Sequence, residues 1–145
     1  MLQSSNREPP HPPFDAVVPI VRQEDLVIAR QTVRDAAREL GLGTVDQTRI
    51  ATVMSELARN VLNYAGRGQC RIHARSTDDF NQIILEVEDA GPGIVDISAA
   101  LTPGFSTHNG YGLGLPTVKK LATVLTIESR PGRTVITAQF DRRRG

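Results

Sequence analysis

A segment in the middle of the chain combines an apolar helical stripe with a polar one, and this pattern restricts the fold more than any other feature. A capping box at residues 44–47 (TVDQ) predicts the start of a helix, and Gly66 and Gly68 predict its end near residue 65. The apolar stripe consists of Ile50, Val53, Leu57 and Val61, and the polar stripe of Thr52, Glu56, Asn60 and Asn63. Residues four apart lie on the same side of a helix, so Glu56 and Asn60 face a common space. We therefore expect a helix that packs on a core with one side and lines a polar site with the other.

The segments around this helix predict a layered α+β domain. Residues 1–13 carry four prolines and no apolar pattern, which predicts a disordered leader. The remaining patterns predict strands at 14–21, 69–76, 82–89, 126–129 and 134–140, and helices at 23–40, 44–65 and 115–125. Residues 94–109 show no clear periodicity and are interpreted as a lid. The order of these elements predicts a single domain, residues 14–142, built as a two-layer sandwich of a mixed β-sheet with helices on one face.

Composition excludes several classes of protein. The formal net charge is +1, so no bulk charge favours binding to nucleic acid or to an anionic membrane. The single cysteine, Cys70, excludes an internal disulfide and an all-cysteine metal site. The N-terminus does not have the pattern of a signal peptide, and no apolar run reaches the ~20 residues that a membrane helix needs. We therefore expect a soluble, cytoplasmic protein that binds neither nucleic acid nor membrane, with residues 141–144 (DRRR) as a solvated tail.

Three motifs interrupt the core pattern with residues that suit a binding site. They are the pair Glu56 and Asn60, the loop 89–93 (DAGPG) and the glycine run 110–114 (GYGLG). Each also has an ordinary structural interpretation: a boundary pair on a helix, a turn, and a tight connection before a helix. The glycine run is not a P-loop, which needs Gly-Lys-Ser/Thr, and it is not the dinucleotide fingerprint, whose third glycine position falls on Leu115.

One end of a nucleotide fits the loop at residues 89–93. Alternation along the preceding strand places Asp89 on the apolar side at the strand's end. Its carboxylate can accept a hydrogen bond from an exocyclic amine such as adenine N6. Gly91 and Gly93 leave room for the flat ring.

The other end of the nucleotide fits the glycine run and the helix. Glycines let the backbone of residues 110–114 approach an anion, and a helix N-terminus presents free N–H groups to it. Because no lysine or arginine occurs in residues 94–118, peptide N–H groups and a metal would have to carry the phosphate charge. Asn60 can offer its amide oxygen to Mg²⁺, and Glu56 can take a proton from an incoming hydroxyl. The three motifs together predict an ATP site.

The order and spacing of these motifs resemble the GHKL superfamily of ATP-binding proteins, which includes gyrase, Hsp90, histidine kinases and MutL. The resemblance covers about residues 14–142, with Glu56-x-x-x-Asn60 as the N box, residues 89–93 as the first glycine box and residues 110–114 as the second. It implies the Bergerat-type two-layer fold, with ATP and Mg²⁺ as cofactors. It also implies that Thr134, after a Pro-Gly-Arg turn, supports the adenine-binding aspartate. The nucleotide-binding residues implied by the boxes and their flanks are Asn60, Asp89, Gly91, Gly93, Ile94, Ser106, Thr107, Gly110, Tyr111, Gly112, Leu113, Gly114, Leu115 and Thr134.

Within that superfamily the chain most resembles small bacterial serine/threonine kinases of the RsbT type, which act as stressosome switch kinases. The phrases GLGTVDQTRIATVMSELARNVLNYAGRGQ, VEDAGPGI and FSTHNGYGLGLPTVKKLA carry this resemblance. It implies an ATP-dependent kinase for seryl residues on STAS-domain proteins, either a stressosome scaffold or an anti-sigma-factor antagonist. It also implies that the released kinase binds and activates a PP2C-type phosphatase. In this interpretation Glu56 is the catalytic base and Asn60 is the metal ligand.

Two stretches depart from patterns of the wider superfamily. Asn63 stands where many members carry a lysine, and His108 and Asn109 occupy the stretch where the RsbW and SpoIIAB anti-sigma kinases carry an arginine. Both departures remove a phosphate-contacting cation and argue against a direct anti-sigma role. The main alternative to a kinase is an ATP-gated binding module that sequesters a sigma factor or regulator, and a simple ATPase is a third interpretation. The presence of Glu56 favours the kinase, because nucleotide binding alone needs no base there.

Overall fold

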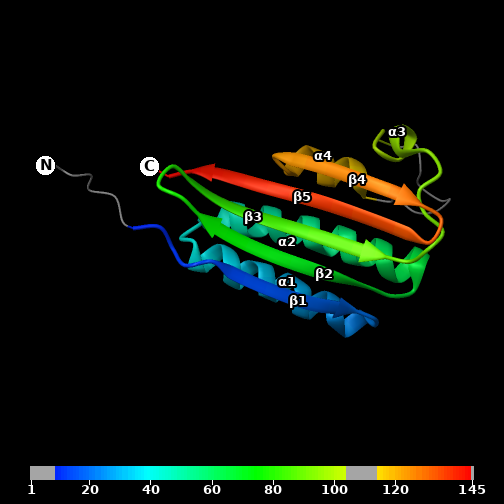
Figure 1. Cartoon of the computed structure of the whole chain (residues 1–145), viewed down its shortest axis with the longest axis horizontal. Helices are drawn as coiled ribbons and strands as arrows, with labels where there is room; N and C mark the ends of the chain where they lie inside the picture. The colour runs from blue at the N-terminus through cyan, green and yellow to red at the C-terminus, as the bar shows by residue number, and fades with distance from the viewer. Residues whose placement is uncertain (1–8, 104–113, 145) are drawn as a thin grey trace, which may run out of the picture.

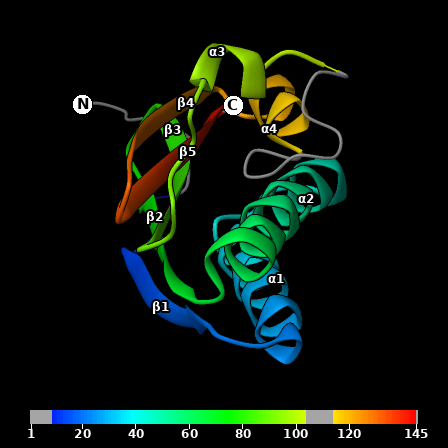
Figure 2. The ribbon, with the colours of Figure 1, turned by 90° about the vertical axis from the view of Figure 1, so that its right-hand side faces the viewer.

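A five-stranded sheet and a layer of helices on one of its faces make up the molecule (Figure 1). The computed structural model describes residues 9–103 and 114–144. In chain order its elements are β1 (Phe14–Ile20), α1 (Gln23–Glu39), α2 (Thr44–Asn60), the π-helical turn η1 (Val61–Ala65), β2 (Gly68–Ser76), β3 (Phe80–Asp89), α3 (Ile97–Ala100), α4 (Leu115–Leu121), β4 (Val124–Arg130) and β5 (Arg133–Arg143). Figure 2 shows α1, α2 and α4 on the same side of the sheet, which confirms the predicted two-layer α+β fold. No helix in this described part is long and apolar enough to cross a lipid bilayer.

Neighbouring strands in the described part of the chain are all antiparallel, in the order β1-β2-β3-β5-β4. The prediction of a mixed sheet is therefore wrong in this detail. Two helices, α1 and α2, connect β1 to β2, so the chain reverses its direction three times and the two strands become antiparallel. A single long connection with α4 joins β3 to β4, so these two strands run the same way, but β5 lies between them. The last strand in the sequence thus occupies an interior position in the sheet.

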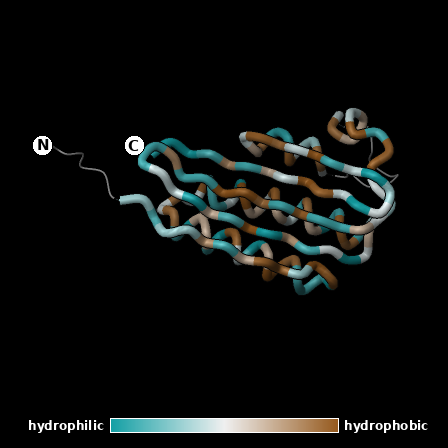
Figure 3. The backbone as a smooth tube through the Cα atoms, viewed as in Figure 1, coloured by the Kyte–Doolittle hydropathy of each residue, from teal (hydrophilic) through white to brown (hydrophobic). Residues whose placement is uncertain are grey.

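The buried face of the sheet follows the alternation that the sequence predicts, as the hydropathy along the strands shows (Figure 3). Cys70 lies on the buried side of β2 with none of its surface exposed, and burial raises the pKa of its thiol. On β3, the core residues are Ile83, Leu85 and Val87. Asp89 follows on the same side with 4% of its surface exposed. Because a shift of one residue would move this whole row to the other face, the register of the sheet fixes the direction of the Asp89 side chain.

The central helix starts and ends at the predicted residues, but its N-cap and its last turn differ from the sequence prediction. Thr44 is the first helical residue, and Gly43 occupies the N-cap position with an extended backbone, so the predicted capping box does not form. The predicted apolar stripe on α2 is buried. After Asn60 the chain continues as the π-helical turn η1, and Gly66 ends it with a φ of 82°. Turns of this kind inside helices frequently mark functional sites.

The helix α4 is shorter than its sequence pattern indicates. It ends at Leu121, because Ala122 adopts an extended backbone with a ψ of 148°. Leu125, which the helical spacing places on this helix, belongs to β4 and pairs with Ala138 of β5. The run VLTI at 124–127 is rich in residues that favour strands, and this preference outweighs the helical spacing.

The C-terminal arginines are held by the domain and do not form the predicted solvated tail. The Arg142 guanidinium donates two hydrogen bonds to the Asp46 carboxylate, at 2.7 and 2.6 Å, which joins the end of β5 to the start of α2. The hydrogen bond from Arg142 lowers the pKa of Asp46. The Arg143 guanidinium lies 5.5 Å from the centre of the Phe80 ring, within range of a cation–π contact. These contacts require partners that are distant in the sequence.

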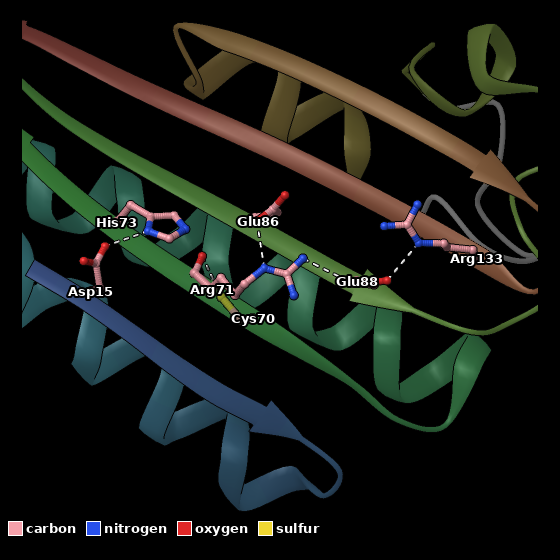
Figure 4. Close-up of polar contacts among 7 residues, drawn as sticks. All are labelled: Asp15, Cys70, Arg71, His73, Glu86, Glu88 and Arg133. Carbon is pink, nitrogen blue, oxygen red and sulfur yellow. Dashed lines mark hydrogen bonds and ion pairs between the residues drawn. The ribbon is translucent and has the colours of Figure 1, made fainter.

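The opposite face of the sheet carries rows of ion pairs (Figure 4). Arg71 on β2 donates to Glu86 and Glu88 on β3, at 2.8 and 2.9 Å, and Arg133 on β5 donates to Glu88 at 2.9 Å. Partly exposed pairs of this kind contribute about 0–1 kcal/mol each. Their main effect is to keep this face of the sheet polar, while the helices cover the other face.

Candidate functional site

The polar stripe of α2 places Glu56 and Asn60 one turn apart, as predicted. Asn60 is buried, with 2% of its surface exposed, and its amide nitrogen has no hydrogen-bond partner among the described residues. Leaving a buried polar group unpaired costs about 1–3 kcal/mol, and such groups call for an explanation such as a ligand, an ion or a water. Glu56 is half-buried, and its Oε1 accepts a hydrogen bond from the Arg59 guanidinium at 2.8 Å. The unpaired amide of Asn60 is the observation that points to a ligand beside this helix.

Gly114 brings the end of the second glycine motif against Glu56. It is the N-cap residue of α4 and has a left-handed φ of 84°, a conformation that favours glycine. A Cβ atom on this residue would overlap the Glu56 carboxylate, so only glycine lets the backbone come this close. The next residue, Leu115, is fully buried and fixes the start of α4 in the core. The start of α4 and the polar stripe of α2 therefore share one space.

The first glycine motif lies against the end of the same helix. Asp89 ends β3, and its Oδ1 accepts a hydrogen bond from the Gly91 N–H at 2.9 Å. A Cβ atom on Gly91 would lie 2.7 Å from the Cβ of Ala65, which is too close for two carbon atoms. Because Ala65 belongs to η1, which directly follows Asn60, this contact brings the Asp89 loop to the end of α2 that carries Asn60.

The hairpin of β4 and β5 holds this loop from the other side. Gly93 has a φ of 87°, and a Cβ atom on it would lie 2.8 Å from a carbonyl oxygen of the hairpin. The Gly132 N–H donates to the Gly91 carbonyl oxygen at 2.8 Å. The Ile94 N–H donates to Ser129 Oγ, also at 2.8 Å. Both predicted glycines of the loop therefore have positions that a larger residue would disturb.

Thr134 lies directly opposite Asp89 in the β3–β5 ladder and is fully buried. Ser129 pairs with Thr134 in the β4–β5 ladder, and their hydroxyl oxygens are 2.7 Å apart. Ser129 is missing from the predicted site residues. The signal that could have identified it is the two-residue turn of Pro131 and Gly132, because a turn of this length places residue 129 opposite residue 134.

Ser129→Ala is expected to lower the free energy of unfolding by about 1–3 kcal/mol. The physical reason is that the Ile94 N–H and the buried Thr134 hydroxyl both lose this hydrogen-bond partner. Urea unfolding followed by circular dichroism measures the loss. Thr126→Ala, on the exposed side of the same strand, is the matched control and should change the free energy by less than about 0.5 kcal/mol. Equal losses in the two variants would contradict a special role for the Ser129 contacts.

Six of the predicted nucleotide-binding residues lie outside the described part of the chain. They are Ser106, Thr107, Gly110, Tyr111, Gly112 and Leu113. Their roles stay predictions. Arg59 is a described residue that the prediction missed, because it lies outside residues 94–118, the segment in which a cation near the phosphates is expected. Its place three residues after Glu56 on a helix is the signal that could have found it.

The described residues form two groups, and the chemistry of each group suits a different end of a nucleotide. At one end, Asp89 and Thr134 stand side by side where an apolar row of the sheet ends, next to a loop whose glycines pack closely against Ala65 and the β4–β5 hairpin. At the other end, the Glu56 carboxylate lies against the backbone of Gly114, and one turn further along α2 the amide nitrogen of Asn60 has no partner among the described residues. Amide and carboxylate oxygens suit a hard cation such as Mg²⁺, and a glycine at a helix start suits phosphate.

Comparison with known proteins defines the class of this protein. Residues 45–144 match the family of histidine kinase-, DNA gyrase B-, and HSP90-like ATPases, and the chain belongs to this family. Within it, the chain is 47% identical over 115 residues to the serine/threonine-protein kinase RsbT of Bacillus subtilis (strain 168). The aligned region covers 79% of this chain and 86% of that kinase. The resemblance to serine/threonine kinases of the RsbT type is thereby confirmed.

Other relatives are more distant. The anti-sigma F factor of Caldanaerobacter subterraneus subsp. tengcongensis is 32% identical over 111 residues, which are 72% of this chain and 76% of that factor. The anti-sigma F factor of Bacillus licheniformis is 29% identical over 108 residues, or 71% and 74% of the two chains. Among solved structures, the SiaB-SiaC complex from Pseudomonas aeruginosa contains a chain with a TM-score of 0.55 and 11% identity, covering 92% of this chain and 91% of that one. This last likeness supports the fold alone.

Proposed function

We propose that this chain is an ATP-dependent protein serine/threonine kinase that phosphorylates a STAS-domain partner in a stress or sigma-factor partner-switching pathway. The observation that carries the proposal is the buried amide nitrogen of Asn60, which has no partner among the described residues and lies one turn from the half-buried Glu56 carboxylate, which itself contacts Gly114. A metal-bound nucleotide fits this arrangement, because a phosphate oxygen can accept a hydrogen bond from the unpaired amide nitrogen, while the amide oxygen would ligate Mg²⁺. The 47% identity to RsbT supports the reaction and the class of substrate.

The base of ATP would bind at the Asp89 end of the site. Asp89 accepts a hydrogen bond from the exocyclic amine, and Thr134 supports this side chain from the neighbouring strand. The base would lie beside the loop at Gly91 and Gly93, whose close packing against Ala65 and the β4–β5 hairpin fixes the backbone next to it. Ile94 follows this loop, and its buried apolar side chain anchors the loop to the core next to the hairpin.

The phosphates and Mg²⁺ would bind between α2 and the start of α4. Mg²⁺ supplies positive charge that neutralises the phosphates, and Asn60 is the protein group that would hold it. The backbone of Gly114 closes on Glu56, and Leu115 keeps this helix start in place. The rest of the glycine run, residues 110–113, lies outside the described residues and is proposed to bind the phosphates.

Glu56 would act as the base in phosphotransfer. Its carboxylate takes the proton of the substrate's seryl hydroxyl while the seryl oxygen forms a bond to the γ-phosphorus. The bond from that phosphorus to the bridging oxygen breaks, and ADP leaves. The position one turn from Asn60 suits this role, because the metal ligand and the base then flank the same phosphate.

The wider assignments rest on the resemblance to kinases of the RsbT type. We propose residues 14–142 as the kinase domain, residues 1–13 as a leader, and the cytoplasm as its location. After phosphorylating the STAS-domain partner, the released kinase would bind and activate a PP2C-type phosphatase. An ATP-gated binding module with little catalysis is the alternative, and the similarity to anti-sigma F factors favours it as the second candidate. The higher identity to RsbT favours the kinase.

Incubation with γ-labelled ATP, Mg²⁺ and the STAS-domain protein encoded nearby tests the proposed function. The kinase predicts label on a seryl side chain of the partner, located by mass spectrometry. The binding module predicts an ATP-dependent complex on gel filtration without transfer of label. Binding of ATP without either result would leave the nucleotide site in place and contradict the assigned substrate class.

Asn60→Ala is expected to weaken the binding of Mg-ATP by about 10–100-fold, the range for loss of a group that supports a bound metal. Binding of ATP in excess EDTA should change by less than about twofold, because the proposed role is toward the metal. Calorimetry under both conditions gives the two affinities. Asn63→Ala removes an exposed amide of the same polar stripe and serves as the control. Equal losses with and without Mg²⁺ would reject the metal-ligand assignment.

A further inference from the structure

Arg59 contacts the proposed catalytic base directly. Its guanidinium lies 2.8 Å from Glu56 Oε1, and 42% of the Arg59 side chain and 25% of the Glu56 side chain are exposed. Ion pairs this exposed, three residues apart on a helix, contribute about 0–1 kcal/mol to stability. The contact therefore adds little to the stability of the fold. Its other effect is to hold the Glu56 side chain in one position.

The two oxygens of the Glu56 carboxylate have different surroundings. Oε1 accepts the hydrogen bond from Arg59. Oε2 is the atom that a Cβ on Gly114 would overlap, so it faces the start of α4. A glutamate at the edge of a helix otherwise has several rotamers available, and restricting it has an entropic cost. Arg59 on one side and Gly114 on the other restrict this side chain, and Oε2 is left at the end of the site assigned to the phosphates.

We propose that Arg59 is a positioning residue for Glu56, which holds Oε1 so that Oε2 is the oxygen that takes the seryl proton. This inference rests on the proposed kinase function. A planar guanidinium suits the task, because its donors have fixed directions and it stays charged at all relevant pH values. Arg59 acts through Glu56, and its removal should slow phosphotransfer without weakening the binding of the nucleotide.

A competing role for Arg59 is direct contact with phosphate. Position 63, one turn further along the helix, is an asparagine and supplies no cation, so Arg59 could take that role. The two roles predict different kinetic effects. A phosphate contact in the bound state lowers the dissociation constant of Mg-ATP, so its loss raises that constant and KM. A positioning contact affects kcat alone, because the ground state is bound as before.

The test compares Arg59→Met with Arg38→Met in single-turnover phosphotransfer and in calorimetric binding of Mg-ATP. Arg38 makes the same kind of contact with an acid three residues away, Asp35, on the exposed side of α1, and so is a matched control. We expect Arg59→Met to lower kcat about tenfold and to change Mg-ATP affinity by less than twofold. Arg59→Lys, which keeps the charge and a donor, should recover part of the rate, and Arg38→Met should match the wild type.

A second readout needs neither nucleotide nor partner. In protein labelled with ¹³C at glutamate carboxyl groups, the Glu56 resonance is assigned by its loss in Glu56→Gln. Arg59→Met should shift or broaden that resonance, because the carboxylate loses its fixed partner, whereas Arg38→Met should leave it unchanged. The double variant Glu56→Gln, Arg59→Met should be no slower than Glu56→Gln alone, because Arg59 acts only through the carboxylate.

Several outcomes would overturn this inference. A tenfold loss of Mg-ATP affinity in Arg59→Met would assign Arg59 to the phosphates. An unchanged kcat, or a double variant slower than Glu56→Gln by the full effect of Arg59→Met, would remove the positioning role. Absence of phosphotransfer in the wild type, with ATP still bound, would instead contradict the proposed kinase function. The carboxyl resonance tests the contact itself in that case, and an unmoved resonance would overturn the inference independently.

Discussion

Glu56→Gln is expected to slow phosphotransfer to the STAS-domain partner by about 10²–10⁴-fold, the usual contribution of a positioned general base. The substitution keeps the size and the helix propensity of the residue and removes its ability to take a proton. The amide of glutamine can still contact Arg59 through its oxygen, so the local structure should change little. Mg-ATP should bind nearly as in the wild type, and the partner should still dock.

Quantification of phosphoserine on the partner at saturating Mg-ATP measures this effect. Glu39→Gln, an exposed glutamate at the end of α1, is the control and should keep the wild-type rate within about twofold. A wild-type rate in Glu56→Gln would remove the catalytic role and favour the ATP-gated binding module. A loss of Mg-ATP affinity equal to the loss of rate would place Glu56 in binding and not in proton transfer.

Asp89→Asn is expected to abolish tight nucleotide binding, with a loss of about 2–4 kcal/mol. In the structure the carboxylate is buried and its Oδ1 accepts the Gly91 N–H at 2.9 Å. A carboxylate can accept from this N–H with one oxygen and from the adenine amine with the other. An amide has one oxygen only, so either the loop or the base would face an N–H group.

Calorimetric titration with ATP measures this loss, and thermal unfolding shows whether Asp89→Asn remains folded. Asp141→Asn is the matched control, since Asp141 accepts hydrogen bonds from Gln82 and Gln139 on the opposite face of the sheet. Unchanged ATP affinity in folded Asp89→Asn would contradict the assignment of this end to the base. Loss of affinity in Asp141→Asn would show that any change in the sheet disturbs the site.

The parts of the site that the sequence predicts are those that depend on local periodicity. Alternation along β3 predicts the burial of Asp89, and helical spacing predicts that Glu56 and Asn60 share one side of α2. Each of these two predictions concerns a single strand or helix, and within one element the residue spacing determines which side chains share a face. The same spacing also contains the Glu56–Arg59 contact, but only a search for cations along the helix itself would find it.

Features that depend on how separate elements meet were harder to predict. The prediction of a mixed sheet is wrong because the turn at Pro131 and Gly132 predicts the β4–β5 hairpin but does not tell which of its two strands joins β3; β5 does so, and it runs antiparallel to β3. The pairing of Arg142 with Asp46 joins residues that are 96 positions apart in the sequence, so no local pattern marks it. The close approach of Gly114 to Glu56 is of the same kind, since a glycine-rich helix start alone does not show which side chain it will meet.

The interior position of β5 has a consequence for how the protein is made in the cell. The chain is synthesised from its N-terminus, and domains fold as their segments emerge from the ribosome. Here β3 and β4 emerge before the strand that must lie between them, and Thr134 arrives on that strand. A nascent chain can form α1, α2 and the β1–β2–β3 part of the sheet, but it lacks Thr134 and cannot complete the proposed site for the base. Competence to bind ATP should therefore appear abruptly, after β5 has emerged, and ribosome-bound chains stalled before residue 133 should not be retained on immobilised ATP.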